Sequence, residues 1–154
     1  MIDFTTSIQP YKGTGIFKLD ASYEETKTLV SSSNVRYSET VFQPNKIHPA
    51  WYLIDIYNNG KDFAINLAFA KNRLFRITLG EDFKGTLPNG ICTGMKIEDA
   101  LTIDKKLWYN DDNDELYESP EGYWLDYYCA NRKIFEITIF IPALERDDFF
   151  DYKW

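Results

Sequence analysis

The side chains best able to do chemistry in this 154-residue chain are carboxylates. Seven acids and no Lys or Arg fall in the window 111–131, which we call the acidic block: Asp111, Asp112, Asp114, Glu115, Glu118, Glu121 and Asp126. Outside the block 17 acids balance 17 bases, so the formal net charge of −7 belongs to the block alone. Such a surface repels nucleic acid and anionic lipid and attracts basic partners. We expect neither nucleic acid nor membrane among the ligands of this chain.

The acidic block was compared with two kinds of carboxylate site. An EF-hand loop starting at Asp111 needs glycine at its sixth position and glutamate at its twelfth, where Leu116 and Gly122 stand instead. A glycoside hydrolase needs two carboxylates that flank one sugar bond. Glu121 and Asp126 are the candidates for such a pair. We therefore predict no metal site, and the hydrolase stays an alternative that linear spacing does not test.

Other catalytic groups are scarce. The chain holds one histidine, His48, in a turn-like stretch before proline, and two cysteines, Cys92 and Cys129, that match no zinc motif and are expected as small apolar core residues. It has no G-x-S-x-G nucleophile turn, no phosphate-binding glycine loop and no dinucleotide fingerprint. We therefore expect no enzymatic activity, no catalytic residue and no cofactor.

The elements that position these residues show a weak internal repeat. The segment Leu74–Leu79 matches Ile134–Ile139 at an offset of 60 residues, and a helix signal lies upstream of each. In the first half Ser22 and Glu25 form a capping box, and in the second half residues 93–101 place apolar side chains at helical spacing. We predict an α+β fold in a single domain, residues 1–154. Its antiparallel sheet is built from two tandem helix-then-strands units, about 13–80 and 90–142, with the helices packed on one face.

Alternation of apolar and polar residues divides the expected strands, at 51–57, 63–69, 74–79, 123–129 and 134–141, into two faces. Two short helices can cover only the aliphatic face. The second face then carries Trp51, Asp55, Tyr57, Asn66, Arg76, Thr78, Trp124, Asp126, Tyr128, Glu136 and Thr138. A face that carries Trp and Tyr among charged residues has the composition of a protein interface. The alternative is that a loop such as 81–89 folds over this face and buries it. The aromatic and acidic tail, residues 143–154, is expected to dock on the domain.

Three segments of the second half carry a resemblance to a known class of proteins. They are Gly94–Leu101, followed by an Asp-rich loop, then Glu118–Trp124 and the strand Ile134–Ile139. Together they resemble the small immunity proteins encoded beside bacterial polymorphic toxins, including those of contact-dependent growth inhibition. The Gly-Met-x-x-x-x-Ala-Leu helix start is also similar to the tandem-repeat layout of β-lactamase inhibitory proteins, although Lys96 stands where those repeats often place threonine. The resemblance implies a sheet whose open face grips an enzyme.

We therefore predict an immunity protein that neutralises a cognate toxin domain, a nuclease with a basic surface, because opposite fields accelerate capture. The chain has no secretory signal at its start, so we expect it in the cytoplasm as a monomer or weak homodimer. The predicted toxin-binding residues are Asp111, Asp112, Asp114, Glu115, Tyr117, Glu118, Glu121, Trp124, Asp126, Tyr128, Glu136, Asp55 and Tyr57. Two alternatives stay open: a sugar- or peptide-binding module on the Trp/Tyr face, and the hydrolase with paired carboxylates.

Overall fold

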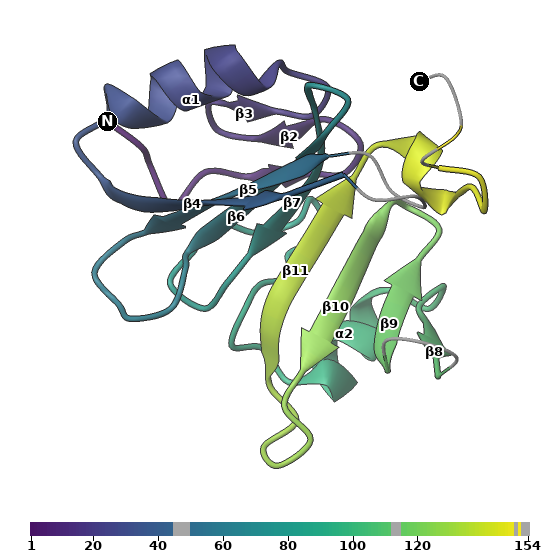
Figure 1. Ribbon diagram of the computed structural model, residues 1–154. Coiled ribbons are helices and arrows are strands. Elements are labelled where there is room, and N and C mark those ends of the chain that lie inside the picture. The colour runs from purple at the N-terminus through teal and green to yellow at the C-terminus, as the bar shows by residue number, and fades with distance from the viewer. Residues whose placement is uncertain (45–49, 112–114, 150, 152–154) are drawn as a thin grey trace.

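The computed structural model describes residues 1–44, 50–111, 115–149 and 151, and it confirms an α+β fold built on an antiparallel sheet. Eight strands pair in the order β4-β5-β6-β7-β11-β10-β9-β8, and three short strands form a second sheet in the order β1-β2-β3 (Figure 1). The first half holds β1 (Ile8–Gln9), β2 (Gly13–Thr14), β3 (Phe17–Lys18), α1 (Tyr23–Ser31), β4 (Arg36–Phe42), β5 (Trp51–Tyr57), β6 (Ile65–Ala70) and β7 (Arg73–Leu79). The second half holds α2 (Ile97–Ile103), β8 (Trp108–Asn110), β9 (Leu116–Ser119), β10 (Tyr123–Tyr127), β11 (Ile134–Phe140) and the 3-10 helix η1 (Pro142–Glu145).

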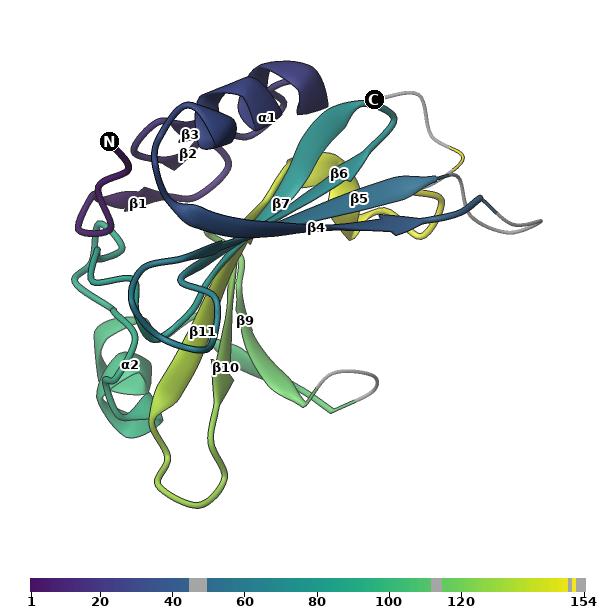
Figure 2. The same cartoon turned by 60° about the vertical axis from the view of Figure 1, so that its left-hand side comes forward.

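The large sheet is bent, and both helices lie outside the bend (Figure 2). We call the side they cover the helix face. Its aliphatic residues come from alternate positions of the central strands, as the sequence predicted, and they join one buried cluster that extends from Ile2 to Phe149. Tyr23 of α1 packs on this face against Tyr52 and Phe69, at ring-centre distances of 4.7 and 5.3 Å. Within the described residues, no helix is long and apolar enough to cross a membrane.

Local sequence signals explain how the helices begin. The Ser22 hydroxyl accepts a hydrogen bond from the Glu25 backbone N–H at 3.3 Å and donates one to the Glu25 carboxylate at 2.9 Å. Ser22 therefore caps α1 as predicted, with the Glu25 carboxylate bonded to its hydroxyl, and α1 starts at the next residue. The second helix begins later than predicted, at Ile97, and Lys96 at its N-cap provides no side-chain hydrogen bond.

The middle of the sheet is the pairing of β7 with β11, the two strands that carry the matching segments of the repeat. Thr78 lies opposite Thr138, and their hydroxyl oxygens are 3.0 Å apart in a buried hydrogen bond. The strand before β7 reaches it through a two-residue turn at Lys71 and Asn72, which both adopt positive φ. That conformation suits the tight turn of a hairpin.

Several sequence expectations about elements were wrong. The strand predicted over 123–129 ends at Tyr127 because the register shifts between Asp126 and Tyr127. Cys129 therefore lies exposed rather than in the core, and Cys92 is only half-buried. Three strands of the large sheet, β4, β8 and β9, were not predicted. The tail, residues 143–154, was expected to dock on the domain. Phe149 does so, because it is buried against Phe75 with ring centres 5.1 Å apart.

A buried carboxylate connects the second helix to the sheet. Asp104, at the C-cap of α2, is 8% exposed and accepts hydrogen bonds from the Tyr123 hydroxyl, from the Ser119 hydroxyl at 2.7 Å and from the Lys106 N–H at 2.9 Å. Burial by itself would raise the pKa of Asp104, but these donors outweigh it and hold the pKa below its ordinary value. Burial and the bond to Asp104 raise the pKa of Tyr123 to about 12.

Removing the Tyr123 hydroxyl should therefore weaken the fold. We expect Tyr123→Phe to lower the free energy of unfolding by about 1–3 kcal/mol, because it leaves a buried charge short of one donor. Urea unfolding measures this, with Tyr117→Phe as the matched control. An equal, small effect of both substitutions would contradict a structural role for the Asp104 carboxylate.

Candidate functional site

The side of the large sheet opposite the helix face, which we call the polar face, carries one row of residues that crosses all eight strands. The register places one residue of each strand in this row: Ser38, Asp55, Asn66, Thr78, Thr138, Trp124, Glu118 and Trp108. Each member is polar, charged or a tryptophan. Because alternate residues of a strand share a face, the row follows directly from the aliphatic pattern that fills the helix face.

Hydrogen bonds within this row hold its side chains in place. The Asn66 amide donates to the Asp55 carboxylate at 2.6 Å, and the pair of threonines bonds as described above. Near the far edge Asn110 donates to the Glu118 carboxylate at 2.8 Å. Asn66, Thr78 and Thr138 are all less than 8% exposed, so they form the floor of the polar face rather than its surface.

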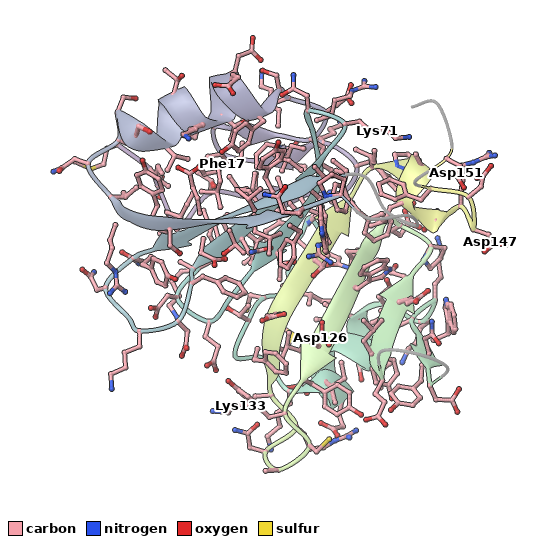
Figure 3. All side chains as sticks on the ribbon, in the orientation of Figure 1. Phe17, Lys71, Asp126, Lys133, Asp147 and Asp151 are labelled. Atoms are coloured by element: carbon pink, nitrogen blue, oxygen red, sulfur yellow. The ribbon has the colours of Figure 1, made fainter. Side chains whose placement is uncertain are left out.

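Above this floor lies a hollow of about 360 Å³, which we call the central hollow. It opens over β6, β7, β11 and β10, the four strands at the middle of the sheet. Figure 3 shows Asp126 near the end of β10, on the side of the sheet away from α2. The lining residues are Leu53, Phe63, Asn66, Arg76, Thr78, Leu116, Trp124, Asp126, Glu136 and Thr138.

Two carboxylates face one another across this hollow. Asp126 of β10 and Glu136 of β11 are direct cross-strand partners, and like charges at such positions repel. Burial, and next the charge of Asp126, raise the pKa of Glu136 to about 7, while the nearby Arg76 lowers it by less. Glu136 therefore changes its charge near neutral pH, unlike an ordinary glutamate.

A second hollow of about 410 Å³ adjoins the first and shares Phe63 and Glu136 with it. We call it the end hollow, because it lies where β5, β7 and β10 end. Tyr128 borders it, stacks on Phe135 with ring centres 4.5 Å apart and donates a hydrogen bond to Glu81 at 3.1 Å. The remaining lining residues are Gly60, Lys61, Asp62, Gly80 and Asp82.

Seven of the predicted site residues lie on the polar face or at its end. Six are on the strands themselves: Asp55, Tyr57, Glu118, Trp124, Asp126 and Glu136. The seventh, Tyr128, borders the end hollow. Tyr57 bonds to the Ser38 hydroxyl at 3.1 Å, and the Arg36 guanidinium carbon lies 4.2 Å from the centre of its ring.

The other predicted site residues do not join this face. Tyr117 lies on the helix face, because its register partner Leu125 belongs to that face, and its ring lies between Tyr109 and Tyr127. Glu121 lies in the β9–β10 turn, ion-paired with Lys106. Asp111 and Glu115 are exposed where β8 connects to β9, whereas Asp112 and Asp114 lie outside the described residues. The acids of the block that the structure describes therefore do not lie on one surface.

Sequence reasoning missed three acids that line the end hollow: Asp62, Glu81 and Asp82. They lie close to strand ends, just before β6 and just after β7. Because neighbouring antiparallel strands begin and end at a shared edge of the sheet, that position was the signal that could have placed them beside Glu136. The described residues contain no group of three His, Cys, Asp or Glu side chains arranged to bind a metal ion.

Comparison with known proteins finds a similar fold and assigns no activity to the chain. No family model and no curated protein matches the chain significantly. A solved structure, that of the uncharacterized protein yfeY from Escherichia coli, superimposes with a TM-score of 0.62 at 11% sequence identity. The match covers 88% of this chain and 99% of the other. At this identity the likeness concerns the fold alone.

The raised pKa of Glu136 predicts how stability depends on pH. The folded carboxyl keeps its proton up to about pH 7, whereas an unfolded glutamate loses it near 4.5, so unfolding becomes easier as the pH rises between those values. We expect Glu136→Gln to stabilise the protein at pH 8 by about 1 kcal/mol, well below the full value of the shift because the side chain is partly exposed to solvent. Near pH 5 the difference should almost vanish.

Urea unfolding at pH 5 and pH 8 checks this expectation. Glu24→Gln, which removes an exposed carboxylate on α1, serves as the matched control and should show no such trend. The same change in stability at both pH values for Glu136→Gln would show that burial and the Asp126 charge do not act on Glu136 in this way.

Proposed function

We propose that this chain is an immunity protein that binds a cognate bacterial toxin domain on its polar face and neutralises it without chemistry of its own. One observation carries the proposal: helices cover one side of the eight-stranded sheet, while a continuous row of polar and tryptophan side chains crosses the other. A rigid face of this kind loses little conformational entropy when a partner binds, which favours affinity.

The composition of the polar face supports a protein partner. Trp108 on the edge strand β8 is 51% exposed, and Tyr128, directly after the end of β10, is 41% exposed. Tryptophan, tyrosine and arginine supply most of the binding energy in typical interfaces. Around the two hollows five acids outnumber Lys61 and Arg76, namely Asp62, Glu81, Asp82, Asp126 and Glu136. Their field suits the basic cleft of a nuclease, which has to hold phosphates.

We infer further that the sheet is made of two tandem units, about residues 13–80 and 90–142. In each unit a helix is followed by four consecutive strands, and the units meet at β7 and β11. The offset of 60 residues relates Thr78 to Thr138, and these two residues bond to each other at the junction. Both units then contribute to one binding face, as in the β-lactamase inhibitory layout. The proposal includes a cytoplasmic location and a monomer or weak homodimer. Among the described residues, β4 and β8 end the sheet with unpaired edges, at which a second copy can add.

The alternative function is a sugar- or peptide-binding module. It is favoured by Trp124, whose ring lines the central hollow beside carboxylate, amide and hydroxyl groups, a combination that suits a small polar ligand. Quenching of tryptophan fluorescence by a monosaccharide or short glycan, in the absence of any protein partner, would favour this alternative over the immunity function.

The immunity function predicts protection against the toxin domain encoded beside this chain's gene. Cells expressing that domain should grow when the chain is co-expressed, and Asp126→Lys should abolish the protection. The purified variant should bind the toxin domain with an association rate at least about tenfold lower, because a positive charge now meets a basic partner. The fold should persist, since a lysine opposite Glu136 replaces repulsion by attraction.

The matched control is Glu24→Lys, the same charge change on α1 at the covered side of the sheet. It should protect cells as well as the parent chain does. For the parent, added salt should slow association far more than it speeds dissociation. An association rate that does not change with salt concentration would contradict binding through the electrostatic field of the polar face. Equal protection by both variants would contradict it as well.

A further inference from the structure

We infer that β4 pairs with β4 of a second copy of this chain, in an antiparallel register centred on Ser38. The inference rests on the proposed function in one respect, because it names the edge and the register of the weak homodimer included there. Its basis is an edge strand that is long, regular and exposed, and whose two charged side chains are already engaged within the chain.

Strand β4 forms one edge of the large sheet (Figure 2). Its seven residues all pair with β5 without a break in register, and no described residue outside β5 pairs with them. Six of the seven are exposed, and the exposed set includes the apolar residues Val41 and Phe42, at 49% and 39%. The outer edge of such a strand presents backbone N–H and C=O groups to which another strand can add.

The devices that usually keep edge strands apart are missing from β4. Edges are commonly protected by shortness, by proline, by a bulge or by free charges. The Glu39 carboxylate instead accepts a hydrogen bond from the Tyr23 hydroxyl at 2.7 Å and pairs with Lys27 at 3.0 Å. The Arg36 guanidinium carbon lies 4.2 Å from the centre of the Tyr57 ring. At the other end of the sheet β8 has only three residues, so it offers a much shorter edge.

The charge of β4 favours a second copy over a basic partner. Arg36 and Glu39 are the charged residues of this strand and they cancel, whereas the whole chain carries a formal net charge of −7. Two copies therefore meet at a neutral edge, although their acidic surfaces repel each other elsewhere. A basic toxin domain gains no electrostatic attraction at β4, and it is drawn to the polar face instead.

Side-chain chemistry selects the register. Because opposite residues of paired strands share a face of the sheet, a symmetric pair of β4 strands places one residue on the two-fold axis. With Glu39 on the axis two carboxylates would oppose each other, which destabilises a sheet. With Ser38 on the axis two hydroxyls face each other. Tyr37 then lies opposite Glu39 of the second copy and Arg36 lies opposite Thr40, so no like charges meet.

The apolar end of β4 agrees with the same register. With Ser38 on the axis, the exposed Val41 lies opposite Val35 of the second copy, a half-buried residue directly before β4. With Thr40 on the axis, Val41 would lie opposite the Glu39 carboxylate instead. The register centred on Ser38 thus covers exposed apolar surface in both copies.

This register has a consequence for the polar face. Ser38 is the residue that β4 contributes to the polar row. When two copies pair at Ser38, their rows join into one that crosses both sheets. The dimer then presents two central hollows on one continuous polar face, and each copy can hold its own toxin domain.

Sedimentation equilibrium of the full chain tests the pairing. The weight-average mass should rise from 18.1 kDa toward twice that value between micromolar and millimolar concentration. We expect Val41→Lys to raise the dimer dissociation constant at least about tenfold, because a lysine on an edge strand opposes strand addition. The matched control is Ile103→Lys, which places the same charge at a 44% exposed apolar residue of α2 and should leave the constant unchanged.

Cross-linking tests the register. In a Cys129→Ser background, Ser38→Cys should give a disulfide-linked dimer in oxidised glutathione, because directly opposite residues lie within disulfide reach. Thr40→Cys in the same background should not, since it faces Arg36 of the second copy.

Three results would overturn the inference: a mass of 18.1 kDa at every concentration, equal weakening by the two lysine variants, or cross-linking at position 40 in place of 38. The protection assay is independent of these measurements. If the chain protects cells but stays monomeric, the inference about β4 is wrong and the immunity function stands. If the dimer forms while protection is absent, the immunity function is the part that fails.

Discussion

The pairing of β7 with β11 is the interaction on which the rest of the structure depends. It joins the two halves of the sheet, and the buried bond between Thr78 and Thr138 lies within it. A slip of one residue in this register would move the aliphatic side chains of β11 to the polar face and bring Glu136 toward the covered core. The polar row continues from one half of the sheet to the other through this register, whereas the register of β10 with β11 sets Asp126 opposite Glu136. A hydroxyl pair is well suited to the position, because it satisfies buried polar atoms without introducing a charge.

The two faces of the sheet use carboxylates in different ways. Asp104 lies on the covered side and is satisfied by three donors, so its charge stabilises the connection between α2 and the sheet. Asp126 and Glu136 lie on the other side and repel each other, which costs stability in the isolated chain. Local arrangements that oppose folding are expected at functional positions rather than in a structural core. This contrast, and not the number of acids, separates the candidate site from the rest of the acidic surface.

The sequence predicted the middle of the fold well and its margins poorly. Strands β5, β10 and β11 alternate because one face is buried, and that pattern placed Asp55, Trp124, Asp126 and Glu136 on the polar face. The end strands β4 and β8 and the short β9 carry no such alternation, since β4 and β8 have a partner on one side only and are largely exposed. The acidic block looked like one surface because its residues are close in the chain, yet strand β9 directs Glu118 to the polar face and Tyr117 to the helix face. Asp62, Glu81 and Asp82 gather beside Glu136 only through pairings between distant segments, which linear spacing does not show.

The central claim, that the polar face is the surface that holds the toxin, is tested most directly by hydroxyl-radical footprinting of the complex. Trp108 lies on the edge strand β8 and Tyr128 borders the end hollow, and both are well exposed in the free chain. Tyr109 is 41% exposed as well, but its register partner Tyr117 places it on the helix face. Binding on the polar face should protect Trp108 and Tyr128 from oxidation and leave the reactivity of Tyr109 unchanged. Protection of Tyr109 with no change at Trp108 and Tyr128 would contradict it.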